Sequence, residues 1–145
     1  MSELPAGFAE VVADFAALPP ADRLQLLVEL GDELPDPPAR LREHPELLEQ
    51  VVECQSPVYV RAEVEGADAP VVRLYLSAPP QAPTTRGFAG VLHAALDGAP
   101  ADDVLALPAD APSRLGLDGV VSPLRLRGMA GMLERVRRQV REQLA

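Results

Sequence analysis

The chain has 145 residues, a net charge of −9 and one cysteine. A chain of this length can bury roughly two thirds of its surface, so we expect residues 1–145 to form a single domain. The negative charge argues against nucleic-acid and membrane partners, and no apolar run is long enough to span a bilayer. One cysteine cannot cross-link a secreted fold, and residues 1–10 do not resemble a signal peptide, so a cytoplasmic protein is expected.

Two helices are predicted at the start of the chain. Apolar residues from Phe8 to Phe15 recur at helical spacing, and Pro19 and Pro20 end that pattern. Pro20 also suits the first turn of a second helix, whose apolar stripe contains Leu24, Leu27 and Val28. The proline-rich residues 31–40 then predict a polar loop, and residues 44–50 form at most a short helix.

The middle of the chain changes to the alternating pattern of strands. Residues 57–66 (PVYVRAEVEG) and 70–80 (PVVRLYLSAPP) are β-branched and alternating, and the turn sequence between them predicts an antiparallel hairpin. Residues 51–55 (VVECQ) are either a third strand or a lead-in to the first. The stretch at 78–83 (APPQAP) interrupts regular structure.

Helical spacing returns in the second half of the chain. Thr84 or Thr85 is a candidate N-cap for a helix whose apolar stripe is Phe88, Val91, Leu92, Ala95 and Leu96. Residues 100–107 predict one or two further turns. A last helix is predicted over residues 122–143, with Ser122 as N-cap, Pro123 as its first residue and a buried stripe of Leu126, Met129, Leu133, Val136 and Val140.

Helices followed by a small sheet and further helices predict an α+β fold. The expected arrangement is an antiparallel sheet of about three strands, with helices packed on one face.

Several kinds of chemistry are excluded by what the chain lacks. One cysteine and two histidines cannot form a zinc or iron–sulfur site in the usual ligand patterns, so no metal site is expected. The sequence has no GxGxxG motif, no P-loop and no Gly-x-Ser-x-Gly motif. His44 lies in a polar region and His93 lies off the apolar stripe of its helix, so a surface position is the default for both.

Cys54 is open to two interpretations. Free cysteine is usually buried and inert, which favours a structural role. Gln55, Ser56 and Pro57, however, follow the sulfur directly and predict a turn at a strand end, where a side chain is presented rather than packed.

Arg125 departs from a local rule. It falls in the first turn of the last predicted helix, where the helix dipole disfavours a cation by a few tenths of a kcal/mol. Such a departure is either a sign of function or the result of pairing with a surface acid, and the sequence leaves both interpretations open.

Four stretches, taken in order, resemble the SufE family of sulfur acceptors, which work with PLP-dependent cysteine desulfurases. Residues 53–60 (ECQSPVYV) resemble its cysteine motif, and residues 27–35 (LVELGDELP) its second helix and the loop that follows. Residues 84–92 (TTRGFAGVL) resemble the start of its long middle helix. Residues 115–138 resemble its C-terminal helix region, including a Ser-Pro-x-Arg motif.

The resemblance implies an α+β fold shared with iron–sulfur scaffold proteins of the IscU kind. It implies that Cys54 accepts persulfide sulfur, that Gln55 and Ser56 shape the cysteine loop, and that Arg125 is the family's arginine near that cysteine. It further implies a bacterial, cytoplasmic accessory protein without a cofactor or turnover of its own. Its expected partners are a SufS-like cysteine desulfurase, which carries PLP, and downstream iron–sulfur assembly proteins.

Two departures from the family pattern lie where the partner is expected to dock. Glu53 stands where the family often has glycine, and the loop at 77–85 lacks an acidic residue that the family can carry. Glu53 is expected to raise the pKa of Cys54, whereas a cation such as Arg125 would lower it if it lies close. The alternative function is a protein-binding regulator of the same fold in which Cys54 is not used.

Overall fold

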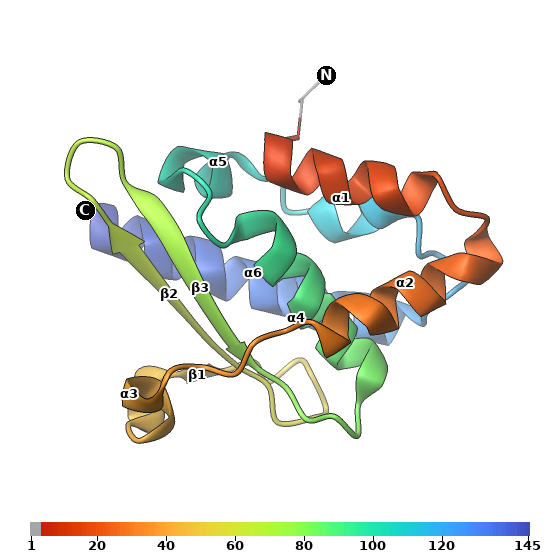
Figure 1. The fold of residues 1–145 in the computed structure, drawn as a ribbon, viewed down its shortest axis with the longest axis horizontal. Coiled ribbons are helices and arrows are strands. Elements are labelled where there is room, and N and C mark those ends of the chain that lie inside the picture. Colours follow the sequence, from red (N-terminus) through yellow and green to blue (C-terminus); the bar gives the residue numbers. More distant parts are fainter. Residues whose placement is uncertain (1–3) are drawn as a thin grey trace.

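The structure is a computed structural model that describes residues 4–145. Within that range the chain forms helices at both ends and a three-stranded sheet between them (Figure 1). In chain order the elements are α1 (Ala6–Ala16), α2 (Pro20–Asp32), α3 (Ala39–Arg42), the 3₁₀ helix η1 (Pro45–Leu47), β1 (Glu49–Gln50), β2 (Tyr59–Glu65), β3 (Val71–Ser77), α4 (Pro83–Leu96), α5 (Ala101–Ala106), the 3₁₀ helix η2 (Ala111–Leu115) and α6 (Pro123–Leu144).

The sheet is antiparallel in the order β1-β2-β3, as the predicted hairpin requires. Val60 lies opposite Leu76 and Ala62 lies opposite Leu74, and all four side chains are buried. Directly opposed residues project from the same face of a sheet, so this face is the one that packs into the core. The α+β prediction is therefore confirmed.

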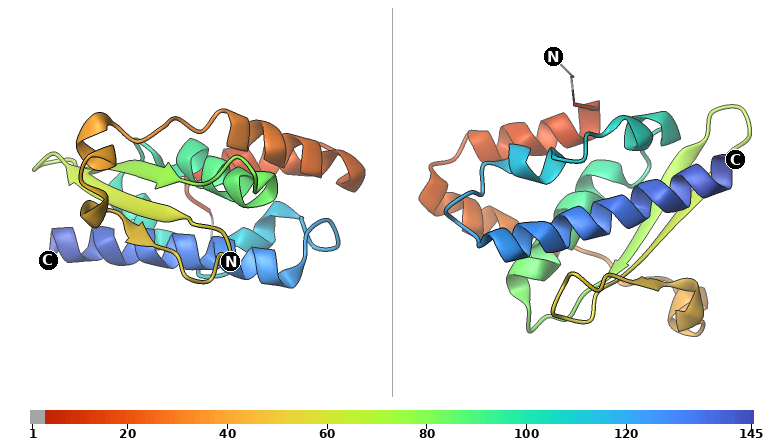
Figure 2. Two further views of the ribbon diagram at one scale, coloured as in Figure 1. Left: turned by 90° about the horizontal axis from the view of Figure 1, so that it is seen from below. Right: turned by 180° about the vertical axis from the view of Figure 1, so that it is seen from behind.

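The long helices cover that buried face. α6 packs along β2, and α4 packs against β3 and α6, while α1 and α2 pack against α4 (Figure 2). The predicted stripe of α6 is buried at Met129, Leu133, Val136 and Val140, and Leu126 is half-buried. The four-residue α3 lies at the other face, where the Arg40 guanidinium is 5.4 Å from the centre of the Tyr75 ring.

Two glutamines of α6 pair with the backbone of β2, because β1 is too short to cover that edge. The amide of Gln139 accepts a hydrogen bond from the Ala62 N–H at 2.8 Å and donates one to the Val60 carbonyl at 3.5 Å. One turn later, Gln143 accepts from the Val64 N–H at 2.9 Å and donates to the Ala62 carbonyl at 2.8 Å. The two side chains thus make the contacts that a neighbouring strand would make.

Several local predictions are wrong. α2 continues to Asp32, further than the predicted loop at 31–40 allows, and Leu24 is 39% exposed rather than buried. α4 begins at Pro83, so neither Thr84 nor Thr85 caps it. Among residues 4–145, no helix combines the length and the apolar character that a bilayer-spanning segment needs.

The third strand is two residues long and lies upstream of the predicted segment. β1 consists of Glu49 and Gln50, whereas most of residues 51–55 forms a turn, so this segment is a connection into β2. The predicted N-cap of the last helix is confirmed, because the Ser122 hydroxyl accepts a hydrogen bond from the Arg125 N–H at 3.3 Å.

Candidate functional site

Cys54 lies in the turn that joins β1 to β2. The Val51 N–H donates to the Val58 carbonyl at 2.9 Å and closes a loop of residues 51–58, which we call the Cys54 loop. Inside it, the Cys54 N–H donates to the Val51 carbonyl at 3.1 Å. The turn predicted from Gln55 and Ser56 is therefore present, and it holds the half-buried thiol outside the regular sheet.

Two glycines of α6 let the Cys54 loop lie directly on the helix. A Cβ atom at Gly128 would lie 3.0 Å from the Cys54 sulfur, and one at Gly131 would lie 2.7 Å from a carboxylate oxygen of Glu53. Glycine costs a helix about 1 kcal/mol relative to alanine. The close approach of the loop explains why α6 nevertheless has glycine at both positions.

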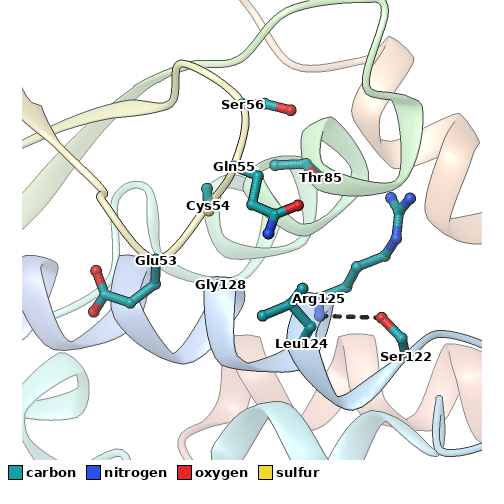
Figure 3. Close-up of a pocket in the computed structure, with 9 residues that line it drawn as sticks. All are labelled: Glu53, Cys54, Gln55, Ser56, Thr85, Ser122, Leu124, Arg125 and Gly128. Carbon is teal, nitrogen blue, oxygen red and sulfur yellow. Dashed lines mark hydrogen bonds between the residues drawn. The ribbon is translucent and has the colours of Figure 1, made fainter.

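The thiol borders a cavity of about 270 Å³ between the Cys54 loop, α4 and the start of α6. All four residues singled out from the sequence line it, namely Cys54, Gln55, Ser56 and Arg125. In Figure 3 the Gln55 amide points down toward α6, and Arg125 extends from the first turn of that helix. The remaining lining residues are Glu53, Thr85, Ser122, Leu124 and Gly128.

The surroundings of Cys54 favour the neutral thiol. Burial raises the pKa of Cys54 most, the Glu53 carboxylate raises it further, and the Arg135 guanidinium lowers it, with a result of about 11. Glu53 therefore acts in the expected direction. The cation that opposes it is Arg135, not Arg125. At neutral pH the loop holds a thiol, not a thiolate.

Arg135 is the functional candidate that sequence reasoning missed. Its guanidinium contacts both oxygens of Glu53, at 3.0 and 2.9 Å, and lies 3.4 Å from an oxygen of Glu49. These contacts hold the pKa of Glu53 below its ordinary value. Arg138 pairs in turn with Glu49, which extends the network along α6.

A sequence signal for this surface does exist. Leu124, Gly128, Gly131 and Arg135 follow one another at helical spacing and therefore lie on one face of α6. Two glycines on one helical face are unfavourable unless something packs closely there. That combination marks a docking face for another part of the chain.

The two histidines lie outside the site. His44 is exposed. His93, on α4, lies 3.7 Å from Asp97, which directly follows that helix, and it does not line the cavity that the thiol borders. Across residues 4–145, no group of three or more histidine, cysteine or acidic side chains is arranged to hold a metal ion.

Comparison with known proteins agrees with this geometry. The sequence model of the SufE family, described as an Fe-S metabolism associated domain, matches residues 9–140. SufE-like proteins from two strains of Mycobacterium tuberculosis are each 51% identical over 141 residues, which cover 97% of this chain and 96% of theirs. The solution structure of a hypothetical protein from Thermus thermophilus matches with a TM-score of 0.85 and 38% identity, over 98% of both chains. The chain therefore belongs to the SufE family.

Proposed function

We propose that this protein accepts sulfur from a PLP-dependent cysteine desulfurase onto Cys54 and passes it on for iron–sulfur cluster assembly. The observation that carries the proposal is the position of the thiol. It lies on a loop outside the sheet, at the edge of a cavity also lined by Gln55, Ser56 and Arg125. A cysteine with a purely structural role would be packed among the valines of β2.

The transfer requires one thiol in this chain. The Cys54 thiolate attacks the outer sulfur of a persulfide on the desulfurase, a new S–S bond forms at Cys54, and the partner's cysteine leaves as a thiolate. The PLP chemistry that creates the persulfide belongs to the partner. Because the sulfur stays on Cys54 as a persulfide, no second cysteine is needed.

The raised pKa lowers the reactivity of Cys54 in the free protein. With a pKa of about 11, the thiolate fraction at pH 7 is on the order of one part in ten thousand. Burial is the largest cause of that rise, so moving the loop outward would lower the pKa and activate the thiol. The proposal thus links activation of Cys54 to docking of the desulfurase.

Exposed apolar side chains near the thiol suit a protein partner. Val52, in the Cys54 loop, is 70% exposed, and Leu124, in the cavity wall, is 42% exposed. A desulfurase that covers both would remove apolar surface from water while it reaches the sulfur. This position favours a macromolecular partner at the site.

The test is mass spectrometry of Cys54 after incubation with a SufS-like desulfurase, PLP and cysteine. We expect the chain to gain one sulfur atom at Cys54, and Cys54→Ser to gain none and to lose stimulation of sulfide release. If Cys54→Ser stimulates fully and wild-type Cys54 stays unmodified, the acceptor role is wrong. The protein would then be a binding regulator of the same fold.

A further inference from the structure

The ion pair between Glu53 and Arg135 differs from an ordinary surface pair. It is bidentate, with nitrogen–oxygen distances of 3.0 and 2.9 Å, and the Arg135 side chain is only 16% exposed. Arg135 also donates to the Gly131 carbonyl at 3.1 Å, which ties the guanidinium to its own helix. A planar, two-point contact held in this way fixes orientation as well as distance.

The same pair fastens the Cys54 loop. Among the described residues, it is the only side-chain hydrogen bond or ion pair formed by residues 52–57. Gly131 has no side chain where the Glu53 carboxylate lies, and Gly128, about one turn earlier, leaves room for the Cys54 sulfur. The neighbouring residues Glu53 and Cys54 therefore pack against Gly131 and Gly128 of α6, respectively.

We propose that Glu53 and Arg135 form a latch that holds the Cys54 loop closed on α6, so that Arg135 positions the thiol and limits its exposure. The role of this latch in sulfur transfer rests on the proposed function. Its effect on the thiol does not, because the free protein must break the same contact whenever the loop opens. A docking partner would have to release Glu53 from Arg135 before it could reach the sulfur.

The latch and simple electrostatics predict different effects. The charged groups around the thiol are Glu53, Arg135 and, across the cavity, Arg125. Through charge alone, Glu53→Gln would lower the pKa of Cys54 and speed its alkylation, whereas Arg135→Gln would raise the pKa and slow it. Through the latch, both substitutions open the loop and remove burial, so both speed alkylation.

The experiment measures iodoacetamide alkylation of Cys54 across pH 7 to 10.5 in the free protein. We expect Glu53→Gln and Arg135→Gln each to raise the rate roughly two- to fivefold, the range expected for a partly exposed ion pair, and to lower the apparent pKa of Cys54. Gly131→Ala should act in the same direction without any change of charge, because the new Cβ displaces the Glu53 carboxylate.

The matched control is Glu63→Gln. It breaks another bidentate pair, with Arg40 at 2.6 and 2.9 Å, which lies away from the thiol, and it should leave alkylation unchanged. A slower or unchanged Arg135→Gln would overturn the latch, as would an unchanged Gly131→Ala beside a faster Glu53→Gln. If circular dichroism shows that Arg135→Gln is unfolded, the other two variants decide. No desulfurase is present, so the latch stands or fails separately from sulfur transfer.

Discussion

The thiol of Cys54 couples proton binding to the stability of the fold. Its pKa rises from 9.0 to about 11 in the folded chain, mainly through burial. The folded state therefore binds this proton more tightly than the unfolded state. The resulting contribution to the free energy of unfolding is present below pH 9 and is lost as the pH rises to about 11.

This coupling predicts a pH dependence that a serine variant lacks. Between about pH 9 and 11, the free energy of unfolding should fall more steeply for the wild-type chain than for Cys54→Ser. Urea unfolding of both proteins at matched pH values measures the difference, and the other titrating groups are common to both. Parallel pH profiles would show that the fold does not raise the pKa of this thiol.

At the scale of the element, α6 has three roles. Its first turn contributes Arg125 to the cavity, its glycine face contacts the Cys54 loop, and its last turns pair with the backbone of β2. Its first turn contains Arg125, whose side chain is exposed while its backbone N–H is held by Ser122. Among residues 4–145, no acidic side chain pairs with Arg125, so the interpretation as an ordinary surface ion pair finds no support. The Arg125 side chain instead lines the cavity that Cys54 borders.

We predict that Arg125→Ala slows sulfur transfer and leaves stability almost unchanged. Removing a cation from the first turn of a helix should be neutral or stabilising by a few tenths of a kcal/mol. Thermal unfolding and persulfide transfer from the desulfurase are compared on the same preparation, with Arg127→Ala as the control on the same helix. A large loss of stability with normal transfer would make Arg125 a structural residue.

The hydrophobic periodicity of the sequence predicted where most helices and strands lie, but it predicted the residues at which they begin and end less accurately. The stripes of α1, α4 and α6 were predicted because burial repeats with the period of the helix. The short β1 was not located, since a two-residue strand carries no pattern of its own, and residues 51–55 were left open between a third strand and a lead-in. Leu24 was wrongly assigned to the buried stripe of α2, because an apolar residue can also lie on the surface of a protein.

The candidate site was only partly accessible from sequence. Cys54, Gln55 and Ser56 are neighbours in the chain, so their turn follows from local chemistry. The contact between Glu53 and Arg135 joins residues 82 positions apart, and no local pattern specifies such a pair. The two glycines of α6 are the sequence feature that could have indicated this contact. Glycine destabilises a helix, so two on one face suggest that another segment packs closely there.

At the scale of the whole molecule, the sheet depends on the last turns of the chain. Gln139 is only 8% exposed, and its amide oxygen accepts from the Ala62 N–H, which lies beyond the two β2 residues that pair with β1. Replacing it leaves this buried N–H unpaired, at a cost of about 1–3 kcal/mol.

We predict that Gln139→Leu lowers the free energy of unfolding by about 1–3 kcal/mol. The Gln139→Leu, Gln143→Leu double variant should in addition self-associate through the uncovered edge of β2. Chemical denaturation and light scattering measure the two effects, with Gln25→Leu on α2 as the control. A monomeric double variant of normal stability would contradict the strand-like role of the glutamines.

The pairing of these glutamines with β2 also sets an order of events during synthesis. The ribosome completes β2 long before the two glutamines. Gln139 lies 77 positions after its partner Ala62, and Gln143 lies 79 positions after its partner Val64. Until residues 139–143 emerge, the nascent chain presents an open strand edge, the kind of surface that chaperones and neighbouring chains bind. A chain cut short before residue 139 would therefore contain every strand of its sheet and still be prone to aggregation.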